Sequence, residues 1–196
     1  MITSVLAGTG TYHQESDQIK PWLGLAFAGI LITLLVATRM PMVSRIVAEP
    51  GSLARMTLPH TVRVVGVVFL IVMALGHLPA AFALPAGLGD IAIGLAAPVI
   101  ARRLASGDRR GAVRFHLLGI FDLVVAVGIG FFSGLGPYRP LATTPSTESL
   151  SLLPLALIVT VAVPLAVTLH VTALRRLHAA TEPDPDEARQ ALSAAS

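Results

Sequence analysis

The sequence contains no cysteine, a single lysine and a single tryptophan, and few charged residues of either sign. Without cysteine the chain cannot form a disulfide, a thiolate metal site or a cysteine nucleophile. Charged residues make up 13% of the chain, against about 25% in an ordinary soluble domain. Hydrophobic residues make up 54% and the mean hydropathy is +0.77, so the composition is that of a membrane protein.

The basic residues are spread along the sequence rather than gathered in one patch. They give a net charge of +3 and a pI of about 10.2, which on a soluble domain would favour nucleic acid as a partner. Here they lie between apolar runs, where basic side chains meet lipid headgroups. We therefore expect the lipid bilayer as a partner and no nucleic acid.

Five apolar stretches are long enough, or nearly so, to cross a hydrocarbon core of about 30 Å as helices, which takes about 20 residues. They cover residues 21–38, 62–80, 86–101, 115–133 and 152–173. We expect Pro85 to mark the start of the third stretch, so that the second and third form a tight helical hairpin. The sequence thus predicts an all-α integral membrane bundle of five transmembrane helices within residues 21–178. Residues 1–20 form a separate N-terminal segment.

Arginine and lysine are distributed unequally over the connections between these stretches. The connection after the first stretch holds Arg39, Arg45, Arg55 and Arg63, and the one after the third holds five arginines. The connection after the second holds none. Because basic residues favour the cytoplasmic side, we expect the N-terminus outside and the C-terminus inside. Residues 179–196 combine acids, prolines and small residues, which predicts a disordered cytoplasmic tail, and the compact loops favour a bacterial inner membrane.

Two acids, Asp90 and Asp122, fall inside predicted spans. With a rise of 1.5 Å per residue, Asp90 lies about 6 Å inside the outer edge and Asp122 about 10 Å inside the inner edge, which separates them by about 13 Å in height. A charge at the centre of a transmembrane helix costs about 2.5–3.5 kcal/mol, so such residues usually have a partner or a task. We expect Asp90 to pair with His77 or to cap its helix, whereas Asp122 has Thr33, Thr168 and His170 at its height and no evident cationic partner.

Small residues share a helical face with each acid. Gly87 and Gly94 lie at helical offsets from Asp90, and Gly119, Ala126 and Gly130 lie at helical offsets from Asp122. Small residues allow transmembrane helices to approach closely. We therefore expect the third and fourth spans to pack against each other through these faces.

The residues around Asp90 read GLGD, which resembles the G-x-G-D signature of intramembrane aspartyl proteases. In those enzymes this Asp works with a second membrane Asp, and the resemblance implies Asp122 in that role. The order differs from that of the presenilin-like families, where the other Asp comes earlier in the chain, and no P-A-L motif follows. A protease-like enzyme therefore stays a minor alternative, and no residue is assigned a catalytic role.

Four histidines gather near the predicted cytoplasmic ends of the spans: His60, His116, His170 and His178. Such a group could hold a metal ion or haem. No H-x-x-x-H spacing occurs among them, so we expect no metal and no other cofactor.

The leading functional prediction is transport or permeation of a small solute or proton. Asp122 would be the principal polar site, with Asp90 and His77 near the outer entrance. The different surroundings predict that Asp90→Asn mainly lowers the folded yield, whereas Asp122→Asn folds and loses proton movement. The alternative is an accessory subunit without a site of its own, joined to another membrane protein or to a second copy through its small-residue faces.

Overall fold

The computed structural model describes residues 2–9, 11, 22–134, 140–141 and 143–179, and every regular element within them is helical. Four helical segments are long and apolar enough to cross a membrane, and a bent pair of helices makes a fifth candidate. The expectation of an all-α membrane bundle is therefore confirmed. Ala179, the first residue of the predicted disordered tail, ends the last helix, and the rest of the tail and most of the N-terminal segment lie outside the described residues.

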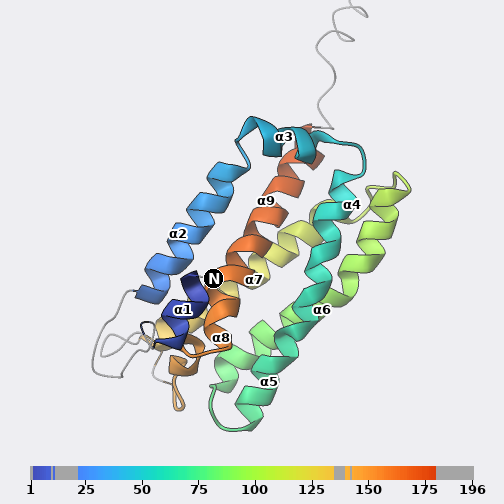
Figure 1. The fold of residues 1–196 in the computed structure, drawn as a ribbon. Coiled ribbons are helices and arrows are strands. Elements are labelled where there is room, and N and C mark those ends of the chain that lie inside the picture. The colour runs from blue at the N-terminus through green and yellow to red at the C-terminus, as the bar shows by residue number, and fades with distance from the viewer. Residues whose placement is uncertain (1, 10, 12–21, 135–139, 142, 180–196) are drawn as a thin grey trace, which may run out of the picture.

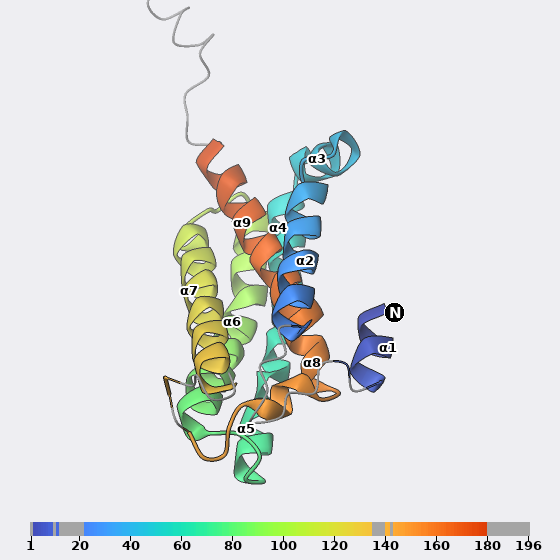
Figure 2. The same ribbon diagram turned by 90° about the vertical axis from the view of Figure 1, so that its left-hand side faces the viewer.

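The first candidate span is the bent pair. After the short helix α1 (Ile2–Gly8), α2 (Trp22–Ala37) runs along the bundle, and α3 (Pro41–Ala48) turns away from it by 73°. Pro41 opens α3, because its fixed φ suits a first helical turn and its missing N–H costs nothing there. Figures 1 and 2 show α2 alongside the C-terminal helix, with α3 lying across one end of the bundle.

The second span begins ten residues earlier than expected. It runs without a break through α4 (Ser52–Thr57), the 3₁₀-helix η1 (Leu58–Gly66) and α5 (Val67–Ala74). Gly51, with φ of +76°, reverses the chain direction just before it. Arg63, expected at the edge of this span with the loop arginines, therefore lies eleven residues inside it.

The third span is also longer than expected. Helix α6 (Ala80–Ala105) begins directly after Pro79, so Pro85 lies inside the helix rather than in front of it. Pro85 removes only the hydrogen bond to the carbonyl of Ala81, in the first turns, and the helix continues through it. Asp90 consequently lies ten residues from the start of the helix, about 15 Å deep, and does not cap it.

The last two spans agree more closely with the ranges predicted from the sequence. Helix α7 (Ala112–Gly134) follows a short connection, and the 3₁₀-helix η3 (Glu148–Ser151) precedes the final span. That span comprises α8 (Leu155–Leu157), a π-helical turn, η4 (Ile158–Ala162), and α9 (Val163–Ala179). Pro164 has no backbone N–H to donate to the preceding turn, so the regular α-helical hydrogen bonding is interrupted there. This accounts for the π-helical winding of η4.

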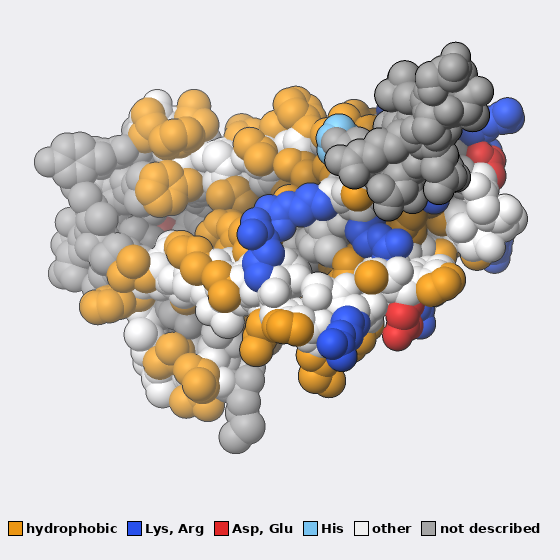
Figure 3. Space-filling model, turned by 90° about the horizontal axis from the view of Figure 1, so that it is seen from above, with side chains coloured by type: hydrophobic (Ala, Val, Ile, Leu, Met, Phe, Trp, Pro, Cys, Tyr) orange, Lys and Arg blue, Asp and Glu red, His pale blue; other side chains and the backbone are white. Residues whose placement is uncertain are grey.

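Helix α6 lies at the centre of the packing, against η1, α4, α5 and α7, while α9 packs against α2, α4 and α7. Figure 1 shows the start of α2 and the end of α9 at opposite ends of the bundle, as an odd number of crossings requires. Seen from above, the end formed by α3, the α6–α7 connection and the end of α9 carries a scatter of Arg side chains (Figure 3). The structure does not assign this end to a side of the membrane, so the orientation stays a prediction.

The small residues do pack closely, but only some of them against the expected partner. A Cβ on Gly94 would lie 2.7 Å from the backbone nitrogen of Val64, and a Cβ on Gly87 would lie 2.8 Å from Leu70, so both glycines face the second span. Gly119 faces α9, whereas Gly130 meets side chains of α6 and η3, and Ala126 packs on the same apolar cluster. The close approach of α6 and α7 comes instead from Gly89.

Candidate functional site

One arginine joins the two membrane acids. The Arg63 Nε–H donates to Asp90 Oδ1 at 2.6 Å, and Nη2 donates to Asp122 Oδ2. The side chain of Arg63 is only 8% exposed, and those of Asp90 and Asp122 are 15% and 14% exposed. Two carboxylates around one guanidinium leave the triad with a net charge of −1 when all three groups are ionised.

The position of Arg63 follows from the winding of η1. A 3₁₀-helix has three residues per turn, so residues three apart lie on one line along its face. Thr57, His60, Arg63 and Gly66 have this spacing, and in an α-helix they would fan out over half the circumference. The 3₁₀ winding therefore turns all four towards the interior, where Thr57, His60 and Gly66 are buried.

Two glycines make room for the acids. A Cβ on Gly66 would overlap Asp90, and a Cβ on Gly89 would overlap the carboxylate of Asp122. Gly66 thus lets η1 approach Asp90 on α6, and Gly89 lets Asp122 on α7 reach across α6 towards Arg63. These contacts hold the two acids, from α6 and α7, at the depth of Arg63 on η1.

A chain of hydrogen bonds continues from Arg63 into the histidines. Arg63 Nη1 lies 3.3 Å from His170 Nε2, His170 Nδ1 lies 2.8 Å from His116 Nδ1, and His116 Nε2 lies 3.4 Å from Thr57 Oγ1. An arginine can only donate, so His170 Nε2 must accept and its Nδ1 carries the proton. His116 Nδ1 then accepts, and His116 Nε2–H donates to Thr57, whose hydroxyl donates to the Leu53 carbonyl at 2.7 Å. These bonds are all satisfied by neutral imidazoles.

His60 completes the histidine group. Its ring stacks on that of His170, with centroids 3.7 Å apart and planes 16° apart. One ligand nitrogen from each of His60, His116 and His170 lies within 4.8 Å of the others, and all three residues are buried. The Nε2 atom of His60 is itself buried and has no hydrogen-bond partner. The fourth histidine of the predicted group, His178, is exposed in the last turn of α9.

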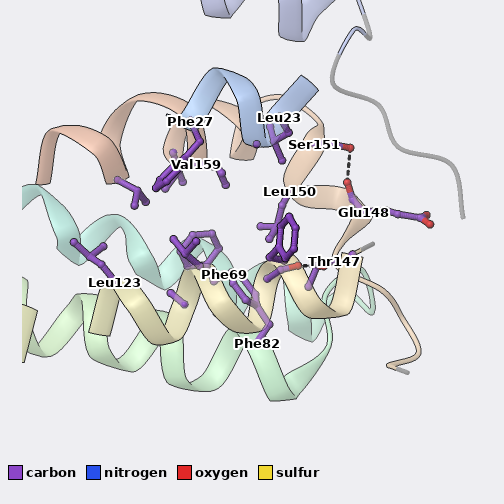
Figure 4. Close-up of a pocket in the computed structure, with 18 of the residues that line it drawn as sticks. Leu23, Phe27, Phe69, Phe82, Leu123, Thr147, Glu148, Leu150, Ser151 and Val159 are labelled. Atoms are coloured by element: carbon purple, nitrogen blue, oxygen red, sulfur yellow. Dashed lines mark hydrogen bonds between the residues drawn. The ribbon is translucent and has the colours of Figure 1, made fainter. Parts of the chain in front are cut away.

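Two cavities meet at Asp90. The larger, about 480 Å³, has an almost wholly apolar lining and extends from Asp90 to Thr147 and Glu148 in the loop before the last span. Figure 4 shows Leu23 and Phe27 of α2 on one side of it, opposite Phe69 and Phe82. The smaller, about 300 Å³, lies between η1 and the last span, with His60 and Arg63 in its wall. Asp122 lines neither cavity among the residues that border them.

Three of the residues named from the sequence come together: Asp90, Asp122 and His170, all through Arg63. The other two do not join them. His77 lies exposed beyond α5, where its backbone carbonyl accepts from Ser149, and the partner of Asp90 is Arg63 instead. The hydroxyl of Thr168 bonds the Pro164 carbonyl of its own helix.

The separation of 13 Å between the acids is therefore wrong, as is the expectation that Asp122 has no cationic partner. Both errors come from the helix bounds, because α6 begins six residues before the predicted span and the second span begins ten residues before its own. The corrected depths bring Asp90 and Asp122 to one guanidinium. The prediction that Asp90 has a structural role and Asp122 a functional one was based on their different surroundings. Because both acids share one guanidinium, that basis is gone.

Sequence reasoning missed Arg63 and Gly89, and it grouped His60, His116 and His170 only by depth, together with His178. Arg63 carried a signal: Thr57, His60, Arg63 and Gly66 repeat polar or small residues every three positions, directly before an apolar run. The sequence placed the three histidines near the same end of their spans, but it did not predict contact between their side chains, because each comes from a different span and only the tertiary fold joins them.

The geometry also bears on the protease resemblance. A catalytic aspartyl dyad shares one proton between two adjoining carboxylates. Here each carboxylate accepts a hydrogen bond from Arg63, which is the arrangement of two ionised acids around a cation.

Comparison with known proteins places the chain in a family. Residues 20–178 match the family described as Domain of unknown function (DUF8737), and the chain belongs to it. No curated protein and no solved structure matches the chain. The matched region covers the five candidate spans, except for the final residue Ala179, and every residue of the site, so the site lies within the family domain.

Proposed function

We propose that the protein moves a small solute across a cell membrane in a proton-linked manner, with Asp90 as the group that exchanges the proton. The observation that carries this proposal is the position of Asp90, which pairs with Arg63 and also borders both cavities. Intramembrane acids in contact with a cavity are typical of ion and proton pathways. The apolar lining of the larger cavity favours a solute with substantial apolar surface.

The second acid has a complementary role in this proposal. When Asp90 takes up a proton, Arg63 remains neutralised by Asp122, and the net charge of the triad changes from −1 to zero. A neutral pair is cheaper to hold in a low-dielectric interior than an unpaired charge. Asp122 therefore keeps Arg63 in place while Asp90 exchanges, which reverses the assignment made from sequence.

The proposed orientation places the Arg-rich end of the bundle in the cytoplasm, in a bacterial inner membrane. The support is the alternation of basic connections along the chain. In this orientation the larger cavity extends towards the external loop before the last span.

Proton movement is tested in reconstituted vesicles that hold a pH-sensitive dye, under an imposed potential that is negative inside. Wild-type vesicles should acidify faster than protein-free vesicles. Asp90→Asn should fall to the protein-free rate, and so should Asp122→Asn, because Asp90 is then the sole counter-charge of Arg63 and stays ionised. Glu49→Gln removes a half-exposed acid at the bundle end and should keep the wild-type rate.

Size-exclusion chromatography of each variant separates loss of flux from loss of fold. A wild-type rate equal to that of protein-free vesicles would contradict the proposal, as would a folded Asp90→Asn variant with an unchanged rate.

A second candidate function, an accessory subunit of a membrane complex, is favoured by α2. None of its residues is buried, and a Cβ on Gly24 or Gly29 would meet nothing within 4 Å. Gly24 borders the larger cavity, whereas a small residue such as Gly29 on an open helix surface suits a partner helix, from another protein or from a second copy. Gly29→Leu should then reduce the mass of the purified assembly in native mass spectrometry without changing the proton flux.

A further inference from the structure

We propose that His60, His116 and His170 form a binding site for a divalent first-row transition metal ion such as Zn²⁺. Imidazole nitrogen is a preferred ligand of Zn²⁺, and three protein ligands with an open fourth position form a recurrent type of zinc site. The three ligand nitrogens already lie within 4.8 Å of one another, on side chains from three different spans. This proposal concerns metal binding alone and does not depend on transport.

The distances between the histidine nitrogens are close to those in a tetrahedral metal centre and need small adjustments. At Zn–N bonds of about 2.0–2.1 Å, two nitrogens in a tetrahedral site lie about 3.3 Å apart. His116 Nδ1 and His170 Nδ1 are now 2.8 Å apart, joined by a hydrogen bond, and would separate slightly around the ion. His60 would have to rotate its ring out of the stack on His170, because the in-plane lone pairs of two parallel rings do not meet at one ion.

His60 gives an independent reason to expect a bound metal ion at this site. A buried polar atom without a partner is uncommon in folded proteins and calls for an explanation. His60 Nε2 is such an atom, in a residue that is 2% exposed and packed against the other two rings. A coordinated metal would supply the missing interaction.

The surrounding charges suit a cation. The nearby triad of Arg63, Asp90 and Asp122 carries a net charge of −1 when ionised, so the carboxylates offset the repulsion between Arg63 and the metal. His60 also borders the smaller cavity, which offers an approach to the site. Thr57 accepts from His116 Nε2–H and would hold that ring in the tautomer that leaves Nδ1 free for the metal.

Metal binding and Arg63 compete for His170. If His170 binds the metal through Nδ1, its Nε2 carries the proton and can no longer accept from Arg63 Nη1, 3.3 Å away. The Arg63 N–H would then turn to the Gly119 carbonyl, now 3.5 Å distant. Occupation of the histidine site thus changes a hydrogen bond of the same arginine that holds both acids.

The test uses full-length protein without a polyhistidine tag, purified in detergent, stripped with a chelator and dialysed against Zn²⁺. Wild type should retain about one Zn²⁺ per chain by elemental mass spectrometry. The His60→Gln variant should bind at least about tenfold more weakly, since even outer-shell changes cost about 10–100-fold. His77→Gln removes an exposed histidine and should bind as wild type does.

Cobalt substitution provides a readout that a purely structural role would not affect. Co²⁺ in the wild-type protein should show the strong visible absorption of a tetrahedral site, and folded His60→Gln protein should lack it. Should His60→Gln fail to fold, His116→Asn tests the same loss. Absence of stoichiometric Zn²⁺ in folded wild type would overturn the proposal, as would equal binding by wild type and a folded ligand variant. Neither outcome would alter the proton flux expected of Asp90.

Discussion

Replacing Arg63 by methionine should destabilise the folded bundle severely. Methionine is apolar and similar in length, so the main change is loss of the guanidinium from between Asp90 and Asp122. These carboxylates are 15% and 14% exposed, and removal of one partner from a buried ion pair typically costs about 3–5 kcal/mol. We expect a loss of this size in the free energy of unfolding.

The exposed pair between Arg55 and Glu49 provides a matched control. Its nitrogen and oxygen lie 2.9 Å apart, but its side chains are 61% and 52% exposed. Ion pairs exposed to this extent contribute only about 0–1 kcal/mol, because water screens them. Arg55→Met should therefore change the free energy of unfolding by less than about 1 kcal/mol.

A triple variant separates loss of attraction from the cost of unpaired charge. Arg63→Met combined with Asp90→Asn and Asp122→Asn removes all three charges while keeping the shapes of the acids. If unpaired carboxylates cause the instability, the triple variant should recover most of the stability lost in Arg63→Met. Unfolding in mixed detergent micelles, followed by circular dichroism, measures all four proteins. Equal stability of Arg63→Met and wild type would refute the reasoning, and so would a triple variant no more stable than Arg63→Met.

Two further predictions concern topology and packing. Thr9→Cys and Ala195→Cys, made singly in intact cells, should react with an impermeant thiol reagent from opposite sides of the membrane, and labelling from one side would exclude five crossings. Gly94→Leu should lower thermal stability in detergent more than Gly130→Leu does, because its Cβ would meet the backbone nitrogen of Val64 at 2.7 Å, whereas that of Gly130 would meet movable side chains at 3.3 Å. Ile91→Leu should have the smallest effect, and equal melting temperatures for all three would contradict the assigned contacts.

The sequence alone was sufficient for the membrane class, the helical fold and the approximate positions of the spans. Each depends on local composition, since any run of about 20 apolar residues must satisfy its own backbone hydrogen bonds in lipid. The same reasoning singled out Asp90 and Asp122, because a carboxylate is conspicuous in apolar surroundings wherever its partner lies.

The tertiary structure alone decided which groups meet. Arg63 faces the acids because η1 winds as a 3₁₀-helix and because the second span begins at Ser52, features that hydropathy does not encode. His60, His116 and His170 are separated by more than 50 residues in sequence at each step, and they come together only when three spans pack side by side. Contacts between helices depend on rotation and depth, and an error of six residues in one helix start displaces a side chain by about 9 Å.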